Sequence, residues 1–183
     1  MKAKFITLFK NYGYLFGVAL ATFIIFRCIF FIGIIPSESM EPTLDIGSGV
    51  FAVRTHDVSK FERGDVIIFT SPEDGETPWI KRVIGVGGDK IEIKEEGVYV
   101  NGKITKEFVD DYEPDYTDFI GETYNVPEGK VFVLGDNRDN SEDARFWDDH
   151  YLGSDKIIGK ALYKYPLRFS CDSGFGTLSE GIF

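Results

Sequence analysis

The apolar residues of this chain form one long run near the N-terminus and a series of short runs after it. The long run contains 16 residues without a charge, from Asn11 to Phe26. As a helix it would span roughly 24 Å, which is short of a hydrocarbon core of about 30 Å. We therefore expect a transmembrane helix that begins at or before Lys10 and has Arg27 near its far end, where the long side chain can reach the interface. The run from Cys28 to Ile35, rich in Ile and Phe, is then expected to begin the folded body as a strand.

After Pro36 the pattern changes to short β-type runs separated by turn residues. One run holds the pair Asn101-Gly102, which is a strong signal for a hairpin turn. No apolar pattern of helical period extends beyond a couple of turns in this region. The expected strands are 49–54, 65–70, 79–86, 90–94, 97–103, 130–134 and 156–165. We therefore predict a mainly β fold, with an N-terminal transmembrane helix in residues 1–30 and an antiparallel β domain in residues 31–183.

Charge is divided unevenly between these two parts. Residues 1–35 hold four basic residues and no acidic residue, so their net charge is +4. The whole chain has 20 basic and 30 acidic residues, which leaves 16 basic against 30 acidic residues, a net of −14, for residues 36–183. An acidic body argues against a nucleic acid as partner, because phosphate backbones are bound by basic surfaces. The lysines Lys2, Lys4 and Lys10 favour a cytoplasmic N-terminus and hence an extracytoplasmic body.

Three stretches of the sequence leave their interpretation open. Ala19 to Ala21 imitates the small-residue site of a cleaved targeting peptide, although more apolar sequence follows it instead of a polar mature start. Cys28 and Cys171 fit neither a disulfide framework nor a zinc site, and whether they are free stays open. The acidic stretch Phe108 to Phe119 is expected to be an exposed loop.

Motifs for metal and nucleotide binding are incomplete. The stretch GDNRDNSEDARFWDDH is similar to a calcium loop, but Arg138 stands at its third position and Ser141 at its sixth, where a ligand and a glycine are needed. The run from Gly85 to Gly88 lacks the third glycine of a dinucleotide fingerprint and leads into a strand pattern. We therefore expect no cofactor and no metal ion.

The stretch PSESMEPTL, from Pro36 to Leu44, directly follows the apolar segment and is stiffened by two prolines. A serine such as Ser39 becomes a nucleophile when a nearby base takes its proton. The chain has only two histidines, His56 and His150, and neither lies in a recognisable setting. A Ser-His-Asp triad still remains possible, since triads are defined by geometry and not by sequence order.

A lysine that has lost its proton is the other base that can activate a serine. Lowering the pKa of a lysine from about 10.4 to near 7 corresponds to roughly 4–5 kcal/mol of differential desolvation, which requires apolar surroundings. Lys81 lies in the run WIKRVIGV, where in a strand it would share an apolar face with Trp79 and Val83. The plainer interpretation of Lys81 is a lysine on an edge strand.

Four motifs, in order along the chain, resemble bacterial type I signal peptidases (leader peptidases), the membrane-bound Ser-Lys dyad serine proteases that remove signal peptides. PSESMEPTL resembles the serine box of this family, and RGDVIIF, Arg63 to Phe69, its conserved strand. KRVIGVGGD, Lys81 to Asp89, resembles the lysine box, and GDNRDNSEDAR, Gly135 to Arg145, the C-terminal box. Each motif alone is weak, but the set is specific and covers most of the body.

The resemblance implies a signal peptidase I type serine endopeptidase that acts on signal-peptide-bearing preproteins at the lipid bilayer. It would be anchored in the bacterial cell (inner) membrane and cut after small residues at P3 and P1. Ser39 would be the nucleophile and neutral Lys81 the general base. The Ser39 backbone N–H and the Ser37 hydroxyl would form the oxyanion hole.

The resemblance also implies supporting and substrate-binding roles. Ser141 would hydrogen-bond and orient the lysine. Asp143 would pair with Arg145, and Asp136 would hold Arg82. The positions that match the small P1 and P3 pockets of the family are Ile35, Pro36, Met40, Leu44, Trp79 and Ile80.

Some positions depart from the family pattern without removing a catalytic group. Glu38 stands where many members carry glycine, and Ala144 replaces a frequent serine. Gly33 offers no side chain to shape the distal substrate pocket. General secretion and a dedicated substrate set therefore both stay open.

Two other functions compete with this interpretation. A self-cleaving Ser-Lys protease of the repressor kind shares the dyad but needs a DNA-binding domain or partner, against which the apolar anchor and the acidic body argue. A non-enzymatic, membrane-anchored β domain would explain the anchor but not the four motifs.

Overall fold

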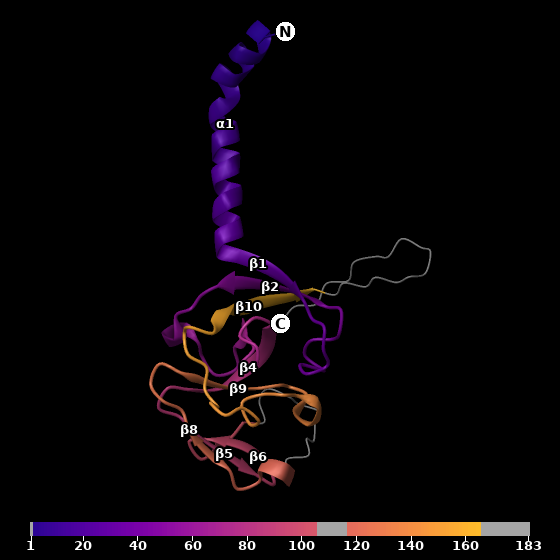
Figure 1. The fold of residues 1–183 in the computed structure, drawn as a ribbon, viewed down its shortest axis with the longest axis vertical. Helices are drawn as coiled ribbons and strands as arrows, with labels where there is room; N and C mark the ends of the chain where they lie inside the picture. The colour runs from indigo at the N-terminus through magenta and orange to yellow at the C-terminus, as the bar shows by residue number, and fades with distance from the viewer. Residues whose placement is uncertain (1, 106–116, 166–183) are drawn as a thin grey trace, which may run out of the picture.

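The structure, a computed structural model, describes residues 2–105 and 117–165, and for residues 2–11 and 117 it describes the backbone only. In this part of the chain a single long helix, α1 (Lys2–Ile29), stands away from a β-rich body (Figure 1). Short 3₁₀ helices lie at Val58–Lys60, Thr117–Phe119 and Arg138–Asn140. The prediction of a mainly antiparallel β fold behind an N-terminal apolar helix is confirmed.

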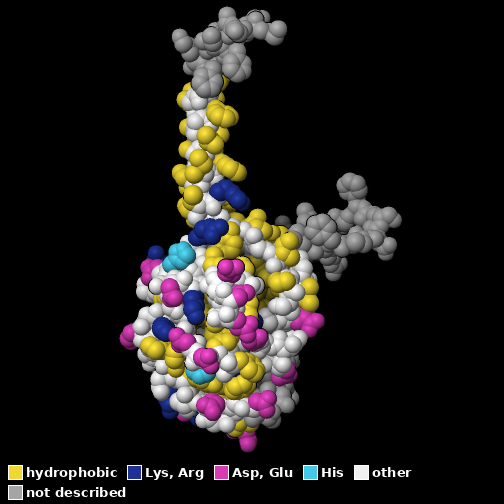
Figure 2. All heavy atoms as spheres, viewed as in Figure 1, with side chains coloured by type: hydrophobic (Ala, Val, Ile, Leu, Met, Phe, Trp, Pro, Cys, Tyr) yellow, Lys and Arg dark blue, Asp and Glu magenta, His cyan; other side chains and the backbone are white. Residues whose placement is uncertain are grey.

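Helix α1 is apolar on all its described sides. Its 28 residues correspond to a length of about 42 Å. From Tyr12 to Ile29 it is long and apolar enough to cross a membrane, and none of this span is buried against the body. Side chains such as Phe16 and Phe23 are 68% and 62% exposed, and hydrophobic side chains cover the helix in Figure 2. Because an all-round apolar helix needs apolar surroundings, a lipid environment fits this surface.

The first sheet has six strands, all antiparallel to their neighbours. Strand β1 follows α1 without a break, so the sheet begins where the helix ends (Figure 1). Strand β4 lies between β3 and β9 and is therefore an interior strand. In spatial order the strands are β1 (Phe30–Ile34), β2 (Gly49–Arg54), β10 (Ile157–Tyr165), β3 (Val66–Thr70), β4 (Pro78–Val86) and β9 (Val131–Leu134).

The second sheet lies at the end of the body far from α1 (Figure 1). Its four strands are ordered β7 (Lys103–Ile104), β6 (Gly97–Val100), β5 (Lys90–Lys94) and β8 (Thr123–Asn125). The hairpin between β6 and β7 turns at Asn101 and Gly102, whose φ angles are 51° and 78°. Both angles are positive, as a two-residue hairpin turn of type I′ requires.

Two apolar clusters fill the body. The larger cluster joins both sheets through residues such as Phe69, Ile91 and Phe132, each 0% exposed. The smaller cluster packs the loop after β1 onto β2, β3 and β4, and consists of Ile35, Met40, Leu44, Val50, Ala52, Ile68 and Ile80. Since burying such a side chain stabilises the fold by about 1.5–3 kcal/mol, the loop between β1 and β2 is firmly attached.

The strand predictions agree well with the structure, with two differences. The bounds of β2 and β5 match the expected strands residue for residue. Strand β8 was not expected, because its three residues are too few to show an alternating pattern. Phe119 is not in an exposed loop: it is half-buried and packs edge-on against Phe146, with the ring centroids 4.9 Å apart.

Two of the questions left open by the sequence concern residues outside the described part of the chain. Cys171 and residues 108–116 of the acidic stretch lie there. Cys28 is described, is exposed and forms no disulfide with another described residue.

Candidate active site

The loop that carries Ser39 is held to the first sheet at both of its ends. The Ile35 N–H donates to the Ser48 carbonyl oxygen at 2.9 Å, and the Gly47 N–H donates to the Ile35 carbonyl oxygen at 2.8 Å. Within the loop, the Leu44 N–H donates to the Met40 carbonyl oxygen at 2.8 Å. Met40 is 0% exposed and anchors the segment next to Ser39 in the core. The position of Ser39 is therefore fixed by its neighbours.

Ser39 itself is buried, with 7% of its surface exposed. Its Oγ lies 3.3 Å from the Oγ of Ser37, which is on the exposed side of the loop. The two hydroxyls expected to act together are thus adjacent. Neither histidine hydrogen-bonds to Ser39: the Nδ1 atoms of His56 and His150 are engaged with the carbonyl oxygens of Ile157 and Ala144.

Lys81 is buried on strand β4, with 4% of its surface exposed. Because β4 is an interior strand, the alternative of a lysine on an edge strand is wrong. The Lys81 Nζ lies 5.9 Å from the ring centroid of Trp79, so the two side chains share a face of β4 as expected. Trp79 packs in turn against Phe69 and Trp147, with centroid distances of 6.5 and 6.1 Å. These rings form an apolar wall beside the amine.

The environment of Lys81 favours its neutral form. Within the described part of the chain, no hydrogen bond or ion pair joins the Lys81 Nζ to another group. Burial lowers the pKa of Lys81 from 10.5 to about 8, although the carboxylates of Asp143 and Glu142 act in the opposite direction. A substantial fraction of this lysine is therefore unprotonated at a mildly alkaline pH.

Gly135 is the point at which Ser39, Lys81 and Ser141 converge. Arg82 pairs with Leu134 across β4 and β9, so Gly135 stands across from Lys81 at the next position. Residues directly across from each other in a sheet share a face. A Cβ at Gly135 would overlap the Ser141 Oγ and the Ser39 carbonyl oxygen. The Ser39 backbone and the Ser141 side chain therefore lie against the strand position that faces Lys81.

The Ser141 hydroxyl is buried and has no hydrogen-bond partner among the residues that the structure describes. The hydrogen bond expected between Ser141 and Lys81 is thus not formed in this structure. A buried hydroxyl without a partner is costly, which makes it a group ready to bond to an amine or a substrate atom brought to it. Its place beside Gly135 puts this unused hydroxyl at the convergence point.

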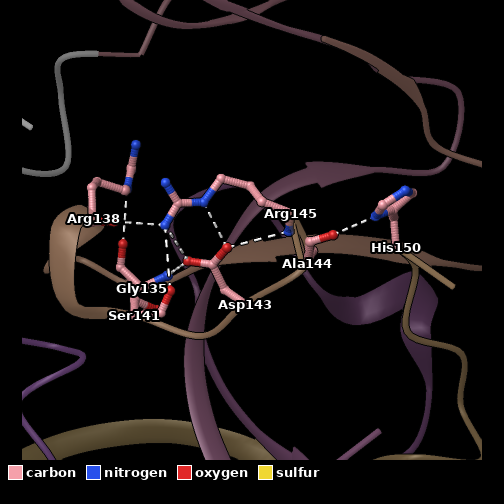
Figure 3. A network of polar contacts seen from close by, with 7 residues as sticks. All are labelled: Gly135, Arg138, Ser141, Asp143, Ala144, Arg145 and His150. Atoms are coloured by element: carbon pink, nitrogen blue, oxygen red, sulfur yellow. Dashed lines mark hydrogen bonds and ion pairs between the residues drawn. The ribbon is translucent and has the colours of Figure 1, made fainter. Parts of the chain in front are cut away.

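The segment that carries Ser141 is held by a buried ion pair, which Figure 3 shows. Arg145 Nε donates to Asp143 Oδ1 at 2.8 Å and Arg145 Nη2 donates to Asp143 Oδ2 at 3.0 Å. Asp143 Oδ2 also accepts from the Gly135 N–H at 3.0 Å, and Arg145 Nη2 donates to the Arg138 carbonyl oxygen at 2.7 Å. Asp143 thus ties Ser141 to the end of β9, as a supporting pair should.

A second ion pair lies on the other face of β4. Arg82 Nε donates to Asp136 Oδ1 at 2.7 Å, and Arg82 Nη2 donates to Asp136 Oδ2 at 2.5 Å. The same guanidinium donates to the Gly64 carbonyl oxygen at 2.8 Å and to Thr43 Oγ1 at 3.3 Å. Asp136 is 0% exposed. This pair therefore connects the loop after Ser39 with β4 and with the end of β9.

The six residues expected to line substrate pockets do not all lie together. Ile35, Met40, Leu44 and Ile80 belong to the smaller buried cluster. Trp79 is on the opposite face of β4, beside Lys81, and Pro36 is exposed. A cavity of about 290 Å³ is lined by Leu44 and Arg82, among other residues. Its charged lining residues are all paired: Asp65 with Lys160, Arg82 with Asp136 and Lys164 with Asp45.

Two asparagines that the sequence analysis did not single out bind the serine loop. Asn137 Nδ2 donates to the Glu38 carbonyl oxygen at 3.2 Å, and the Asn137 N–H donates to the Ser39 carbonyl oxygen at 3.2 Å. Asn140 Nδ2 donates to Glu38 Oε2 at 2.9 Å. Both asparagines lie in the C-terminal box, so this motif is the sequence feature that could have indicated them. They join two segments that are about one hundred residues apart.

Among the described residues, no group of three or more His, Cys, Asp and Glu side chains is arranged to hold a metal ion. The site thus consists of serine hydroxyls, a lysine amine and ion pairs that support them. Such groups can transfer a proton from a hydroxyl to an amine and stabilise an oxyanion.

Comparisons with known proteins show which family this chain is similar to. The sequence model of the family described as "Signal peptidase, peptidase S26" matches residues 9–165. Signal peptidase I of Pseudomonas aeruginosa is 30% identical over 175 residues, which cover 70% of this chain and 62% of that relative. Signal peptidase IB of Staphylococcus aureus is 35% identical over 147 residues, which cover 72% of this chain and 75% of that relative.

Two further similarities have partial coverage. Probable signal peptidase I-2 of Synechocystis is 35% identical over 138 residues, covering 72% of this chain and 61% of that relative. This chain thus spans only 62% and 61% of the length of the Pseudomonas and Synechocystis relatives. A crystal structure of a signal peptidase I from Enterococcus faecalis is 28% identical, with a TM-score of 0.46 over 57% of this chain and 97% of that chain. From the family match over most of its length and the identities to curated relatives, the chain belongs to the signal peptidase family, peptidase S26.

Proposed function

We propose that this protein is a membrane-anchored serine endopeptidase that removes N-terminal signal peptides from exported preproteins, with Ser39 as nucleophile and neutral Lys81 as general base. Its family and the names of its relatives support this activity. The observation that carries the proposal is a buried lysine, without a hydrogen-bonded or ionic partner among the described residues, on the strand face toward which Ser39 and Ser141 converge.

The proposed reaction is an acyl transfer. The Ser39 Oγ attacks the scissile carbonyl carbon while its proton passes to the Lys81 Nζ. The Lys81 ammonium then gives this proton to the leaving amine, and water hydrolyses the ester that remains. The pKa of Lys81, about 8, suits both steps, because the amine accepts a proton and also releases it near neutral pH. Asp143 and Arg145 support Ser141, which would orient the amine.

The Ser37 hydroxyl and the Ser39 N–H are proposed to stabilise the oxyanion. The Ser37 Oγ is 3.3 Å from the Ser39 Oγ, so the Ser37 hydroxyl is adjacent to the proposed nucleophile. Removing one donor of such a hole costs about 10²–10³-fold in kcat. Asp136 and Arg82 would keep the loop after Ser39 in place, since Arg82 bonds both to Asp136 and to Thr43.

Specificity for small residues at P3 and P1 is proposed to come from shallow apolar pockets beside Ser39. Ile35, Met40, Leu44 and Ile80 belong to one buried apolar cluster. Trp79 and the exposed Pro36 would border the same substrate from other sides. A chain with small side chains, bound in extended form, fits such a surface better than a bulky one.

The proposed location is the bacterial cell membrane, with the N-terminus in the cytoplasm and the β-rich domain outside. The apolar helix α1 supports an anchor, and the three N-terminal lysines support the orientation. Residues 1–30 would then be the anchor and 31–183 the catalytic domain. Ser39 lies only five residues after the end of β1, the strand that directly follows α1.

The test is cleavage of a secretory preprotein by the full-length protein in detergent. Wild type should cut after an A-x-A site, while Ser39→Ala and Lys81→Met should each lose about 10³-fold or more in kcat/KM. The matched controls are Ser154→Ala and Lys103→Met, which change exposed residues and should cleave like wild type. Equal cleavage by all five proteins would remove Ser39 and Lys81 from the mechanism.

A further inference from the structure

Glu38 lies between Ser37 and Ser39 and is exposed, whereas Ser39 beside it is buried. The carbonyl oxygen of Glu38 accepts from the Glu41 N–H at 3.0 Å and from Asn137 Nδ2 at 3.2 Å. The backbone at Glu38 is therefore held on two sides, by its own turn and by the C-terminal box. Because the backbone is held, the direction in which the Glu38 side chain leaves the loop is also fixed.

The carboxylate of Glu38 is held at the surface by a neutral donor. Asn140 Nδ2 donates to Glu38 Oε2 at 2.9 Å. Among the described residues, no lysine, arginine or histidine forms an ion pair with this carboxylate. An amide orients a carboxylate without cancelling its charge. The negative charge of Glu38 can therefore act on a charged group that a substrate brings to Ser39.

The other charges near Ser39 have the same sign wherever they reach solvent. Two segments border this serine, residues 37–44 and 137–142. Their basic residue, Arg138, is 5% exposed, and its Nε donates to a backbone carbonyl oxygen at 2.8 Å. Besides Glu38, three charged side chains of these segments are exposed or half-buried, and all are acidic: Glu41, Asp139 and Glu142. The entrance to Ser39 is thus negative, and Glu38 is the carboxylate next to the nucleophile in the chain.

The side of the site from which the mature chain leaves follows from the proposed chemistry. Lys81 gives its proton to the leaving amine, so this amine, which belongs to the first residue of the mature chain (P1′), must come within hydrogen-bonding reach of Lys81. Gly135 stands across from Lys81, and Ser141 lies against Gly135 (Figure 3). Asn140 directly precedes Ser141. The Glu38 carboxylate, which Asn140 holds, therefore borders the leaving side.

We propose that Glu38 is a specificity-determining residue that attracts a basic side chain at P1′ and repels an acidic one. This inference rests on the proposed function and deepens it. Because one carboxylate attracts a lysine and repels a glutamate, its effects on two such substrates have opposite signs and appear in the ratio of their cleavage rates. For charges about 5–8 Å apart at a protein surface, this ratio is expected to be about tenfold at low salt.

The test is a competition between two preproteins that differ only at P1′, with lysine or glutamate after the same A-x-A site. The full-length protein in an uncharged detergent cleaves both in one reaction, and mass spectrometry of the two products gives the ratio of their kcat/KM values. Wild type should favour the lysine preprotein about tenfold at low ionic strength. In about 0.5 M salt the ratio should fall toward one, because exposed charges are screened.

Two variants of Glu38 separate its charge from its contact with the C-terminal box. Glu38→Gln removes the charge but keeps an oxygen that can accept from Asn140, and the ratio should fall about fivefold. Glu38→Lys places a positive charge at the same position and should favour the glutamate preprotein. The matched control is Glu96→Gln, in the exposed turn between β5 and β6 of the second sheet, which should keep the wild-type ratio.

The outcomes separate this inference from the proposed function. A ratio in Glu38→Gln that equals the one in Glu96→Gln overturns the inference, even where both preproteins are cleaved more slowly, since an equal loss is what a merely structural contact would give. A wild type that cleaves both preproteins equally well at low salt also overturns it and leaves the proposed function standing. A wild type that cleaves neither, with its β structure confirmed by circular dichroism, overturns the proposed function and this inference together.

Discussion

A lysine buried without an anionic partner carries its charge at a cost to the fold. Lys81 is 4% exposed, and its pKa of about 8 lies about 2.5 pH units below its ordinary value of 10.5. Such a difference corresponds to about 3 kcal/mol between the charged and the neutral form. The aromatic wall of Trp79, Phe69 and Trp147 makes the surroundings apolar. A catalytic use of the neutral amine would explain why a residue of this kind stays in the core.

This cost gives a prediction for stability. Lys81→Met should stabilise the protein by up to about 3 kcal/mol near neutral pH, where the native lysine is charged. The sign follows from the lowered pKa: between about 8 and 10.5 the native state has lost the proton that the unfolded state still holds, so wild type gains stability as pH rises. The gap between the two proteins should therefore close over this range.

The measurement is urea unfolding of full-length protein in detergent, followed by the fluorescence of Trp79 and Trp147, at several pH values. Lys103→Met, at an exposed position, is the control and should show no such dependence on pH. A difference between Lys81→Met and wild type that is the same at every pH would contradict the assignment of a charge penalty to Lys81.

At the scale of the element, the segment from Gly135 to Arg145 is held by side chains and not by regular secondary structure. Its single 3₁₀ turn, Arg138–Asn140, is short, and Asp143 and Arg145 connect it to the end of β9. The pair is almost fully buried, with side chains 0% and 2% exposed. The position of Ser141 consequently depends on a contact that has lost access to water.

Breaking the Asp143–Arg145 pair should strongly destabilise the protein. Asp143→Asn leaves the buried Arg145 without its counter-charge and should cost about 3–5 kcal/mol of stability, because the remaining ion stays desolvated. The matched control is Asp149→Asn, which breaks the pair of Asp149 with Lys130, whose side chains are 55% and 36% exposed. That exposed pair should contribute no more than about 1 kcal/mol.

Chemical unfolding of both variants in detergent measures the two costs. If Asp143→Asn were as mild as Asp149→Asn, the segment would be held by other contacts and the supporting role of Asp143 would be lost.

At the scale of the whole molecule, the chain consists of an apolar helix and a body with two packed sheets. Strand β1 continues directly from α1 and pairs with β2 along its full length, so the body holds its own first strand. No described side chain of helix α1 belongs to either apolar cluster of the body, although Phe26 does contact Phe51 of β2, with the ring centroids 6.1 Å apart. We therefore expect the body to fold without the helix.

Deletion of residues 1–26 should accordingly leave a folded but aggregation-prone β-rich body. The solubility problem would come from side chains such as Ile32 and Ile34 on β1, each 63% exposed. Far-ultraviolet circular dichroism should report the same β content as the body of the full chain, and light scattering should show aggregation that detergent reverses. Loss of β structure on this truncation would contradict the domain boundary after residue 30.

Much of the fold was predictable because its signals are local. The uncharged run before Arg27 indicates an apolar helix by composition alone, and alternation gives most strands of both sheets within a residue or two. The pairing of Asp143 with Arg145 is also nearly local, since the two residues are two positions apart. Strand β8 was missed because three residues carry too little pattern, and the half-buried Phe119 because a single aromatic in an acidic stretch gives no sign of what it packs against.

The sequence by itself therefore determined the apolar helix, the β class, the family motifs and the candidate serine and lysine, since each is expressed by neighbouring residues. Only the tertiary structure decided that Lys81 is on an interior strand and that Ser39 and Ser141 meet at Gly135 across from it. It also decided the contact of Asn140 with Glu38. These contacts join segments that are tens of residues to about one hundred residues apart. Their formation depends on how the sheets pack, and no local periodicity encodes that packing.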